Sequence, residues 1–429
     1  MEREALPRAT SIDSDLLLDC VHCGFCLEAC PTYQLTRTEM DSPRGRIYTI
    51  KALAEGRLEA QPEVVAHLDL CLGCRGCESA CPAGVRYGRL IEQTRAYLET
   101  RARRPLGQRL KRWLVGQLFP YPGRLEPLLW PARLAEAVGA RPWLERHLPG
   151  ALGDWLALLP RRQEAVAPAL AAAPASGPAV AIHAGCVTRV LAPATIANAA
   201  QLLARAGYRA DPAMFTTCCG ALDLHSGNRA RALAFARANV RRFMQGETDH
   251  VISTASGCTT AMAEYGELLK DDPELAQPAA EFARRVSELS VLLIKAPRPL
   301  EGGCEATVTY HDACHLAHGM GVRREPRQLL QALSGVKLVE LDSADLCCGS
   351  AGSYNLTQPR AAAELGRRKA DTIEQSGAQY VVMANPGCQF QIAAELRRRG
   401  SSIQVMHLAD FLVQAVVRRE QAAAGGEAR

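Results

Sequence analysis

CVHCGFCLEACP, at residues 20–31, returns as CLGCRGCESACP at residues 71–82. We call these segments the first and the second cassette. In each, three cysteines are separated by two residues, and a fourth, followed by proline, comes after three more. This is the ligand spacing of a pair of [4Fe-4S] clusters, in which the fourth cysteine of each segment binds the other cluster. The spacing predicts one cluster on Cys20, Cys23, Cys26 and Cys81 and another on Cys71, Cys74, Cys77 and Cys30.

The crossed pairing makes the two cassettes one folding unit, because neither cluster is complete without a cysteine from the other cassette. A zinc site and a disulfide framework explain the two cassettes less well. Zinc sites commonly take their four ligands as two pairs. A disulfide framework suits neither an odd total of 17 cysteines nor a chain of 429 residues that starts without an apolar signal region. The cassettes therefore indicate an electron carrier in a reducing compartment.

Length and composition predict a globular protein of about three domains, at roughly 150 residues each. Hydrophobic residues make up 48% of the chain, charged residues 22% and aromatic residues 5%. The net charge of +5 is small and its arginines are spread along the chain, which disfavours a nucleic-acid-binding protein. No apolar run approaches the roughly 18 to 20 residues of a membrane span. We expect a cytoplasmic protein, and peripheral contact with the cytoplasmic face of the inner membrane stays open.

The residues between the cassettes predict helices. Ser42 and Pro43 suit a helix start, and apolar residues follow at helical spacing from Ile47. A second helix is predicted over residues 63–70. Residues 1–100 are therefore expected to form a helical ferredoxin domain with two clusters. His22 is expected to be a polar neighbour of the first cluster, because thiolates already fill both sites.

Residues 101–178 have a different character. All 4 tryptophans of the chain lie here among prolines and arginines, and the segment ends in a linker rich in proline and alanine at residues 167–174. Short amphipathic helices with tryptophan and arginine suit a docking surface for a partner protein or for lipid headgroups. Packing against the ferredoxin domain explains the pattern equally well, so both interpretations stay open.

The remaining residues contain an internal repeat of cysteines. Cys186, Cys218, Cys219 and Cys258 return as Cys314, Cys347, Cys348 and Cys388, with offsets of 314 − 186 = 128, 347 − 218 = 129, 348 − 219 = 129 and 388 − 258 = 130. Glycine follows the cysteine pair in both copies. Residues 179–303 and 304–420 are therefore expected to be two copies of one unit, followed by a disordered tail at 421–429.

The flanks of these cysteines predict an α/β fold in both copies. Strands are predicted at residues 179–182 and 251–254 and again at 307–310 and 380–383, with long helices at 228–245 and 358–375. Alternating strands and helices favour parallel sheets, and such folds bind ligands at strand ends, where these cysteines lie. We expect two α/β domains that face each other.

The repeat resembles the cysteine-rich CCG domain of heterodisulfide reductases and of the iron-sulfur subunits of 2-hydroxyacid and glycerol-phosphate dehydrogenases. Within that group the chain is most similar to the iron-sulfur subunits of glycolate oxidases. The motifs that carry the resemblance are CVHCGFC at residues 20–26, PTYQL at 31–35, PRGRIY at 43–48, TASGC at 254–258 and LCCGSAG at 346–352. They span most of the chain.

One departure from the heterodisulfide reductase pattern limits the resemblance. There the last cysteine of each repeat belongs to a Cys-x-x-Cys pair, whereas here the second position is Ala261 or Gln391. A five-thiolate cluster therefore cannot be assigned. The four cysteines left in each repeat could hold a cubane cluster, act as a redox dithiol such as Cys218-Cys219, or be structural. His311, Asp312 and His315 lie near Cys314 as possible nitrogen ligands or proton carriers.

The resemblance implies an electron-transfer subunit. FAD on a partner protein would oxidise glycolate to glyoxylate, and this chain would pass the electrons to quinone, with no catalytic residue of its own. No glycine-rich nucleotide motif in a strand-helix context is present, which agrees with a flavin held elsewhere. The alternatives are a subunit of a D-lactate or glycerol-3-phosphate dehydrogenase and a heterodisulfide reductase-like enzyme.

Overall fold

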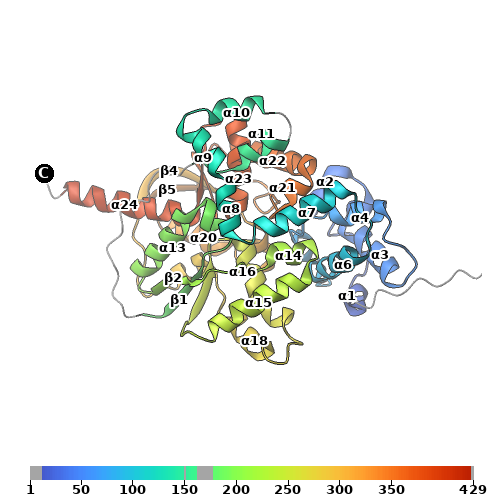
Figure 1. Cartoon of the computed structure of the whole chain (residues 1–429). Coiled ribbons are helices and arrows are strands. Elements are labelled where there is room, and N and C mark those ends of the chain that lie inside the picture. Colours follow the sequence, from blue (N-terminus) through green and yellow to red (C-terminus); the bar gives the residue numbers. More distant parts are fainter. Residues whose placement is uncertain (1–11, 149–150, 162–176, 427–429) are drawn as a thin grey trace, which may run out of the picture.

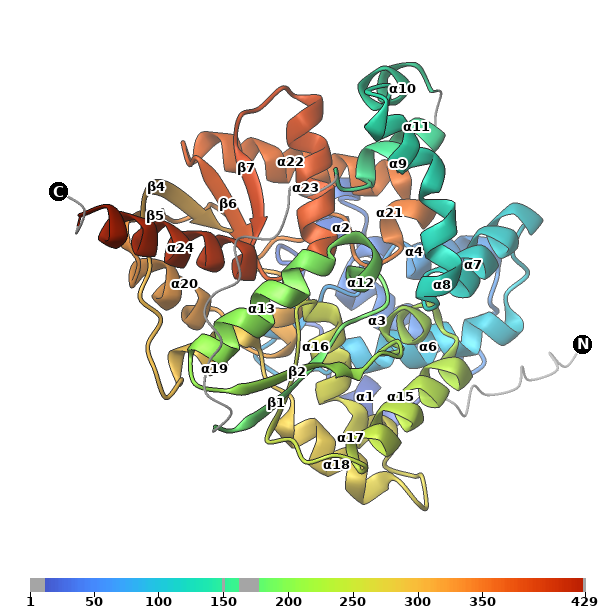
Figure 2. The same ribbon diagram turned by 60° about the vertical axis from the view of Figure 1, so that its left-hand side comes forward.

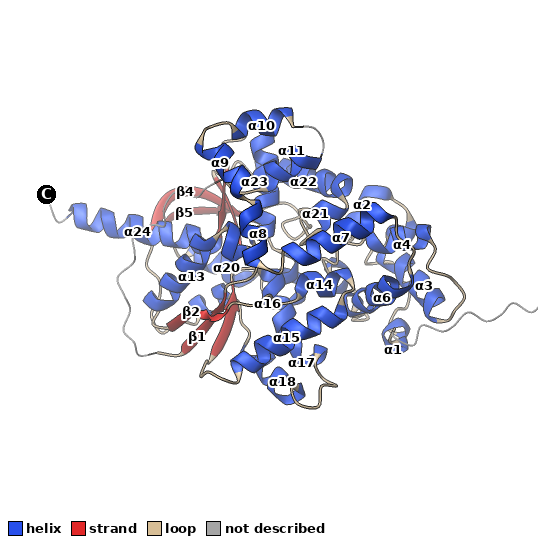
Figure 3. Ribbon diagram, in the orientation of Figure 1, coloured by secondary structure: helices blue, strands red, loops and turns tan. Residues whose placement is uncertain are grey.

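The computed structural model describes residues 12–148, 151–161 and 177–426. Its described part consists of a helical N-terminal region, a group of helices that follows it, and two separate β-sheets (Figure 1). Helices surround both sheets, and the strands lie far from the N-terminal helices (Figure 3). The predicted linker at residues 167–174 lies outside the described residues.

The N-terminal region holds both cassettes between short helices. These are α1 (Ser14–Leu18), α2 (Pro31–Thr36), η1 (Glu39–Asp41), α3 (Pro43–Ala54), α4 (Pro62–Asp69), α5 (Gly76–Ser79) and α6 (Tyr87–Arg101). The predicted helix start is confirmed, since the Ser42 hydroxyl accepts a hydrogen bond of 2.9 Å from the Gly45 amide and Pro43 occupies the first turn. Apolar side chains from α1, α3, α4 and α6 form one core beside the cassettes.

The next helices divide into two kinds. They are α7 (Leu106–Leu118), α8 (Pro122–Leu128), α9 (Trp130–Ala137), α10 (Arg141–His147) and α11 (Ala151–Leu158). Leu125, Leu129 and Leu156 form a small core among α8, α9 and α11, and Val190 of the following α/β unit joins it. Helix α7, in contrast, has no buried residue. The tryptophan-rich segment thus combines packing by α8 to α11 with one helix whose apolar residues stay exposed.

Two parallel sheets follow. The first contains β1 (Ala179–His183), β2 (Arg209–Phe215) and β3 (His250–Ser253) in the order β2-β1-β3. The second contains β4 (Gly303–Tyr310), β5 (Ser334–Val339), β6 (Tyr380–Met383) and β7 (Gln404–His407) in the order β5-β4-β6-β7. The four predicted strands correspond to β1, β3, β4 and β6. All pairs are parallel, as expected when helices connect the strands.

Helices link the strands of each sheet. In the first unit they are α12 (Thr188–Leu191), α13 (Pro193–Arg205), α14 (Ala221–Ser226), α15 (Arg229–Phe243), α16 (Ser256–Ala263), α17 (Tyr265–Leu268), α18 (Ala276–Arg285) and α19 (Leu289–Ile294). In the second they are η2 (His315–Gly319), α20 (Arg324–Gln331), α21 (Tyr354–Thr357), α22 (Pro359–Gln375), α23 (Pro386–Arg398) and α24 (Leu408–Gly426). The predicted long helices correspond to α15 and α22.

The two α/β units share one hydrophobic core. Ile182 of the first sheet, Val308 of the second and Phe411 of α24 belong to the same buried cluster. Helix α24 lies beside α13 of the first unit (Figure 2). Its Asp410 accepts hydrogen bonds from Thr195 at 2.9 Å and from Asn198 at 2.8 Å. The last helix therefore ties the second unit to the first.

One boundary prediction is wrong. The chain was expected to be disordered from residue 421, but α24 continues to Gly426. Its first two turns are held by the shared core, and residues such as Ala422 and Ala423 favour continuation of a helix once it has started. Residues 427–429 lie outside the described residues.

Candidate metal centres

The first cassette forms a tight loop at the surface. His22 and Gly24 have left-handed backbone conformations, with φ of 55° and 89°, so the loop can turn between its cysteines. Cys20, Cys23, Cys26 and Cys81 line one hollow there, together with Cys77. Cys23 is exposed. Burial, with a smaller effect of negative charge on Cys20 and Cys30, raises the pKa of Cys26 to about 11. The hollow thus gathers three thiols of this cassette with the last thiol of the other.

The second cassette is more deeply placed, and Cys30 lies among its cysteines. Burial raises the pKa of Cys74 and of Cys77 well above the ordinary value, and negative charge on Cys30 or Cys71 would raise each further. Burial alone would also raise the pKa of Cys71, but the positive charges of Arg46 and Arg95 outweigh burial and lower it. Cys71 additionally accepts a 3.3 Å hydrogen bond from the Gly73 amide.

Arg46 supplies a buried positive charge to this second group of thiols. Its side chain is 1% exposed and lies 3.6 Å from Asp41, whose side chain is also buried. The guanidinium donates to the Thr32 hydroxyl at 2.9 Å, to the His67 carbonyl at 2.8 Å, and reaches Cys30 Sγ at 4.0 Å. A cation so close favours the thiolate form of cysteine. The sequence analysis gave Arg46 no such role, although Arg46 lies in the motif PRGRIY at residues 43–48.

The cysteines of the first α/β unit converge at one edge of its sheet. Cys186 follows β1, the pair Cys218 and Cys219 follows β2, and Cys258 lies on α16 after β3. The Sγ atoms of Cys186 and Cys218 are 3.6 Å apart. Hydrogen bonds from Cys219 and then from His183 lower the pKa of Cys258 despite its burial. The carboxyl ends of parallel strands meet at this edge, as the repeat predicted.

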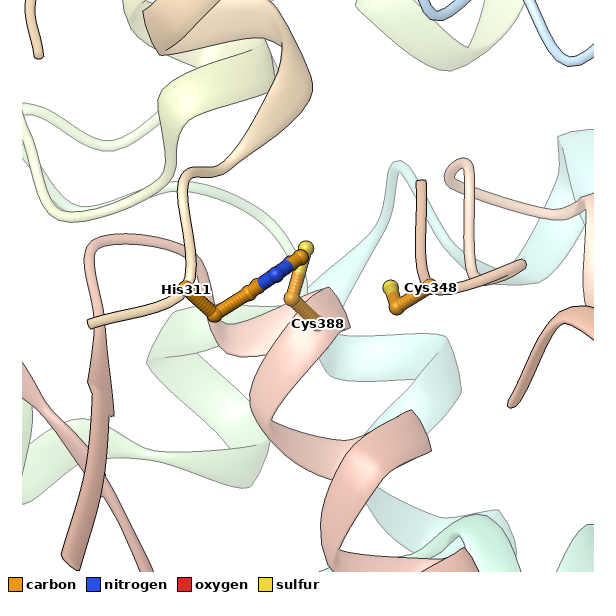
Figure 4. A group of neighbouring side chains, drawn as sticks. All are labelled: His311, Cys348 and Cys388. Atoms are coloured by element: carbon orange, nitrogen blue, oxygen red, sulfur yellow. The ribbon is translucent and has the colours of Figure 1, made fainter. Parts of the chain in front are cut away.

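The second unit repeats the arrangement. Cys314 follows β4, Cys347 and Cys348 follow β5, and Cys388 lies on α23 after β6. Ligand atoms of His311, Cys348 and Cys388 all lie within 4.8 Å of one another, and all three residues are buried (Figure 4). Both ring nitrogens of His311 lack a hydrogen-bond partner within the described residues. Unpaired buried nitrogen beside thiols suits a metal ligand, so these residues fit a bound metal ion or cluster.

The sequence analysis did not identify His183 of the first unit as a candidate ligand. His183 precedes Cys186 by three residues, as His311 precedes Cys314, and 311 − 183 = 128 is the offset of those cysteines. Both histidines end or follow the first strand of their sheet and are buried. His183 Nε2 lies 2.9 Å from the Thr217 carbonyl, and the ring also interacts with the thiol of Cys258. Extending the repeat by three residues would have found it.

Asp312 and His315, the other two predicted ligands or proton carriers near Cys314, have different surroundings from His311. Asp312 accepts two hydrogen bonds from Arg327, at 2.8 and 2.9 Å, so its carboxylate serves a buried ion pair. His315 lies with its Nδ1 at 3.7 Å from Cys314 Sγ and its ring 5.1 Å from the ring of His225. Burial lowers the pKa of His315 well below its usual range. Only His311 joins the group of Cys348 and Cys388.

The second cassette borders the second α/β unit. Cys74, Cys314 and Cys347 lie close enough that charge on one raises the pKa of another. Leu72 and Tyr354 belong to the same small apolar cluster as these cysteines, and the Tyr354 hydroxyl donates to the Leu70 carbonyl at 2.9 Å. The cysteines of the second cassette therefore adjoin those of the second α/β unit. Sequence spacing carries no signal for this contact.

Within the described helices, none combines the length and the apolar character that a membrane crossing requires.

These features define an iron-sulfur protein with a ferredoxin-like region and two cysteine-rich α/β domains. A 4Fe-4S dicluster domain model matches residues 16–85, and a cysteine-rich (CCG) domain model matches residues 180–263 and 308–393.

Relatives that match nearly the whole chain belong to the same class of iron-sulfur protein. The chain is 35% identical to a probable glycolate oxidase iron-sulfur subunit of Bacillus subtilis, over 94% of this chain and 95% of the relative. It is 35% identical to the glycolate oxidase iron-sulfur subunit of Escherichia coli, over 97% and 98%. Lactate utilization protein A of Oceanobacillus iheyensis is 28% identical, over 54% of this chain and 96% of that protein. The chain belongs to the family of glycolate oxidase iron-sulfur subunits.

The buried position of Arg46 leads to a stability prediction. Arg46→Gln removes the buried cation beside Asp41, whose carboxylate keeps only His67 at 2.8 Å. Breaking a buried ion pair by removing one partner typically costs about 3–5 kcal/mol. The midpoint of thermal unfolding should therefore fall clearly. Arg37→Gln is the matched control, because the Arg37 and Glu28 side chains are mostly exposed, and surface pairs contribute about 0–1 kcal/mol. Equal midpoints for the two variants would contradict the role given to Arg46.

Proposed function

We propose that this chain carries electrons within a glycolate dehydrogenase complex, from the FAD of a partner protein to a quinone. The observation that carries the proposal is the gathering of two sets of four cysteines beside each other in a chain of this family. [4Fe-4S] clusters bound there would supply one-electron redox steps. The protein's own residues would set the potentials through thiolate ligation, buried charge and hydrogen bonds to sulfur.

The crossed ligand sets are part of the proposal. The hollow shared by Cys81 with Cys20, Cys23 and Cys26 supports the first set. The proximity by which charge on Cys30 and Cys71 raises the pKa of Cys74 and of Cys77 supports the second. Arg46 and Arg95 would then stabilise negative charge on the second cluster, and burial would exclude water from it.

We propose that the flavoprotein docks beside the first cluster. Cys23 is the one exposed cysteine among the described residues. Val21 and Phe25 line the same hollow and expose most of their side chains, Phe25 to 69%. Apolar side chains grouped at a surface commonly mark a protein interface. A flavoprotein that covers this surface would bring its FAD toward the most accessible cluster.

The two cysteine-rich units are proposed as tandem copies of one fold, and the second is the better candidate for an additional metal centre. The support is the buried group of His311, Cys348 and Cys388. The absence of a second cysteine at Ala261 and Gln391 disfavours disulfide reductase chemistry of the heterodisulfide reductase type.

Glycolate is preferred to lactate as the substrate of the complex. Relatives named for glycolate oxidase match nearly the whole chain at 35% identity. Relatives named for lactate utilization match about half of it at 28%. D-Lactate remains the second candidate substrate, and the same electron path would serve it.

Peripheral contact with the cytoplasmic face of the membrane is also proposed, through α7. Residues 101–125 contain seven arginines and lysines and no acidic residue. Leu106, Leu110, Trp113 and Leu114 of α7 are exposed, Trp113 to 59%, and their spacing places them on one side of the helix. Apolar residues on one side of a basic helix suit binding to anionic lipid headgroups. We therefore assign an anionic lipid surface as the binding partner of this side of α7.

The ligand sets predict the iron content and the effect of Cys81→Ser. Two cubanes correspond to about eight irons per chain. Cys81→Ser should disturb the cluster held by Cys20, Cys23 and Cys26, which paramagnetic resonance of the anaerobically prepared, reduced protein would detect. Loss confined to the other cluster would contradict the crossed pairing. A content near twelve irons would show that a cysteine-rich unit also holds a cluster, and Cys348→Ser would then test the second unit.

Separation of flavin chemistry from electron transfer predicts the behaviour of the complex. The chain alone should not oxidise glycolate with a dye acceptor, and addition of the flavoprotein partner should restore turnover. In the complex, Cys23→Ser should leave flavin reduction by glycolate intact while greatly slowing quinone reduction, because only the path beyond the flavin is cut. Stopped-flow absorbance resolves the two steps. Glycolate oxidation by this chain alone would refute the assignment.

The exposed face of α7 predicts lipid binding. Leu110→Glu should weaken binding of the complex to phosphatidylglycerol vesicles by about tenfold or more, which corresponds to about 1.4 kcal/mol. Met244→Glu is the matched control, because Met244 is similarly exposed but lies at the end of α15. Co-sedimentation measures both. Equal binding of the two variants, or equally strong binding of the wild type to phosphatidylcholine vesicles, would count against this surface.

A further inference from the structure

A cavity of about 570 Å³ lies beneath α7. Its volume falls within the range of roughly 300–1,000 Å³ that is usual for small-molecule sites. Its walls come from the N-terminal region (Asp41, α4 with the following residues 70–72, and Arg95 of α6), from α7 with the preceding residues 103–105, from α14, and from residues 351–358. The N-terminal region, the helices after it and both α/β units therefore meet around it.

The cavity reaches the second cassette. Cys71 and Leu72 are among its lining residues, as is Arg95. Arg95 donates hydrogen bonds to the Cys71 carbonyl at 2.5 Å and to the His225 carbonyl at 3.0 Å. A molecule bound in this cavity would contact the loop that holds Cys71. Electron transfer to such a molecule would need no further centre.

The cavity is lined by hydrogen-bond donors, which favour a ligand with oxygen acceptors. Five cationic side chains take part: Arg95, Arg103, Arg104, Lys111 and Arg112. The Arg104 side chain is 6% exposed and pairs with Asp69, and its Nε lies 3.8 Å from Glu99. Arg103 and Lys111, in contrast, are exposed. Arginine and lysine donate hydrogen bonds and accept none, so this lining favours a ligand with carbonyl or anionic oxygens.

Helix α7 is oriented opposite to an ordinary surface helix. Lys111 and Arg112 line the cavity on its inner side together with Gly107, while Leu110 and Trp113 are exposed. Surface helices of globular proteins usually bury their apolar side. Here the apolar side is free for a lipid surface and the polar side covers the cavity. A ligand that is itself soluble in lipid could therefore reach the cavity from the membrane.

We infer that this cavity binds the head group of a quinone, which takes its electrons from the cluster of the second cassette. The inference rests on the proposed function for the source of those electrons. The quinone gains two electrons and two protons, and both carbonyl oxygens become hydroxyls. The cluster of the second cassette would supply the electrons one at a time, and the cluster of the first cassette would replace the electron that it loses after the first transfer. His67 also lines the cavity, with Nδ1 2.8 Å from Asp41 Oδ1. The two protons come from solvent.

Gly107 provides a direct test by filling the cavity. It lines the cavity, and a Cβ added there meets no atom within 4 Å. Gly107→Leu should therefore fold normally, with unchanged iron content, and should bind decylubiquinone at least about tenfold more weakly than the wild type. Gly123→Leu is the matched control, because Gly123 also faces open space but does not line the cavity. Equilibrium titration of the oxidised, cluster-containing chain measures binding without any turnover.

A rate measurement separates this inference from the proposed function. The chain is reduced with dithionite, freed of reductant and mixed with decylubiquinone, so that neither glycolate nor the flavoprotein is involved. Cluster re-oxidation should be at least about tenfold slower in Gly107→Leu than in Gly123→Leu at quinone concentrations below saturation. Equal binding and equal rates in these variants, or no binding to the wild type, would overturn the inference. Failure of glycolate to reduce the complex would instead overturn the proposed function alone.

Discussion

Cysteine thiols that serve one centre must meet within a few ångströms, although they come from distant parts of the chain, and the fold is organised around this constraint. In the N-terminal region each cassette sends its last cysteine toward the other. In the α/β units, parallel strands bring Cys186, Cys218 and Cys258, and likewise their counterparts, to one edge of a sheet. Helices and sheets thus solve the same geometric problem in two ways.

Burial of so many thiols needs compensating charge. Thiolates removed from water are unstable unless cations or hydrogen-bond donors lie beside them. Arg46 and Arg95 provide this for the second cassette, and both are held in place by backbone carbonyls. The first cassette lies at the surface, where water supplies part of the compensation. The difference in burial suits one accessible site for exchange with a partner and one protected site.

Contacts between domains form part of the candidate sites. Helix α24 joins the two α/β units through a shared core, and Tyr354 joins the second unit to the loop before Cys71. The cavity beneath α7 exists only where these parts meet. Single-domain reasoning would not find it, because each domain supplies only one wall.

The sequence by itself determined the elements whose pattern is local. Regular spacing identified the cassettes, the cysteine repeat and the strands that precede it, because ligand spacing and alternation of strands with helices depend on near neighbours. The tertiary structure alone decided that Arg46 is buried rather than exposed, that Asp312 pairs with Arg327, and that Cys74 lies beside Cys314. It also decided that α24 continues past residue 421. These outcomes depend on contacts between residues far apart in the chain, and burial and charge pairing at such contacts leave no periodic trace in a single sequence.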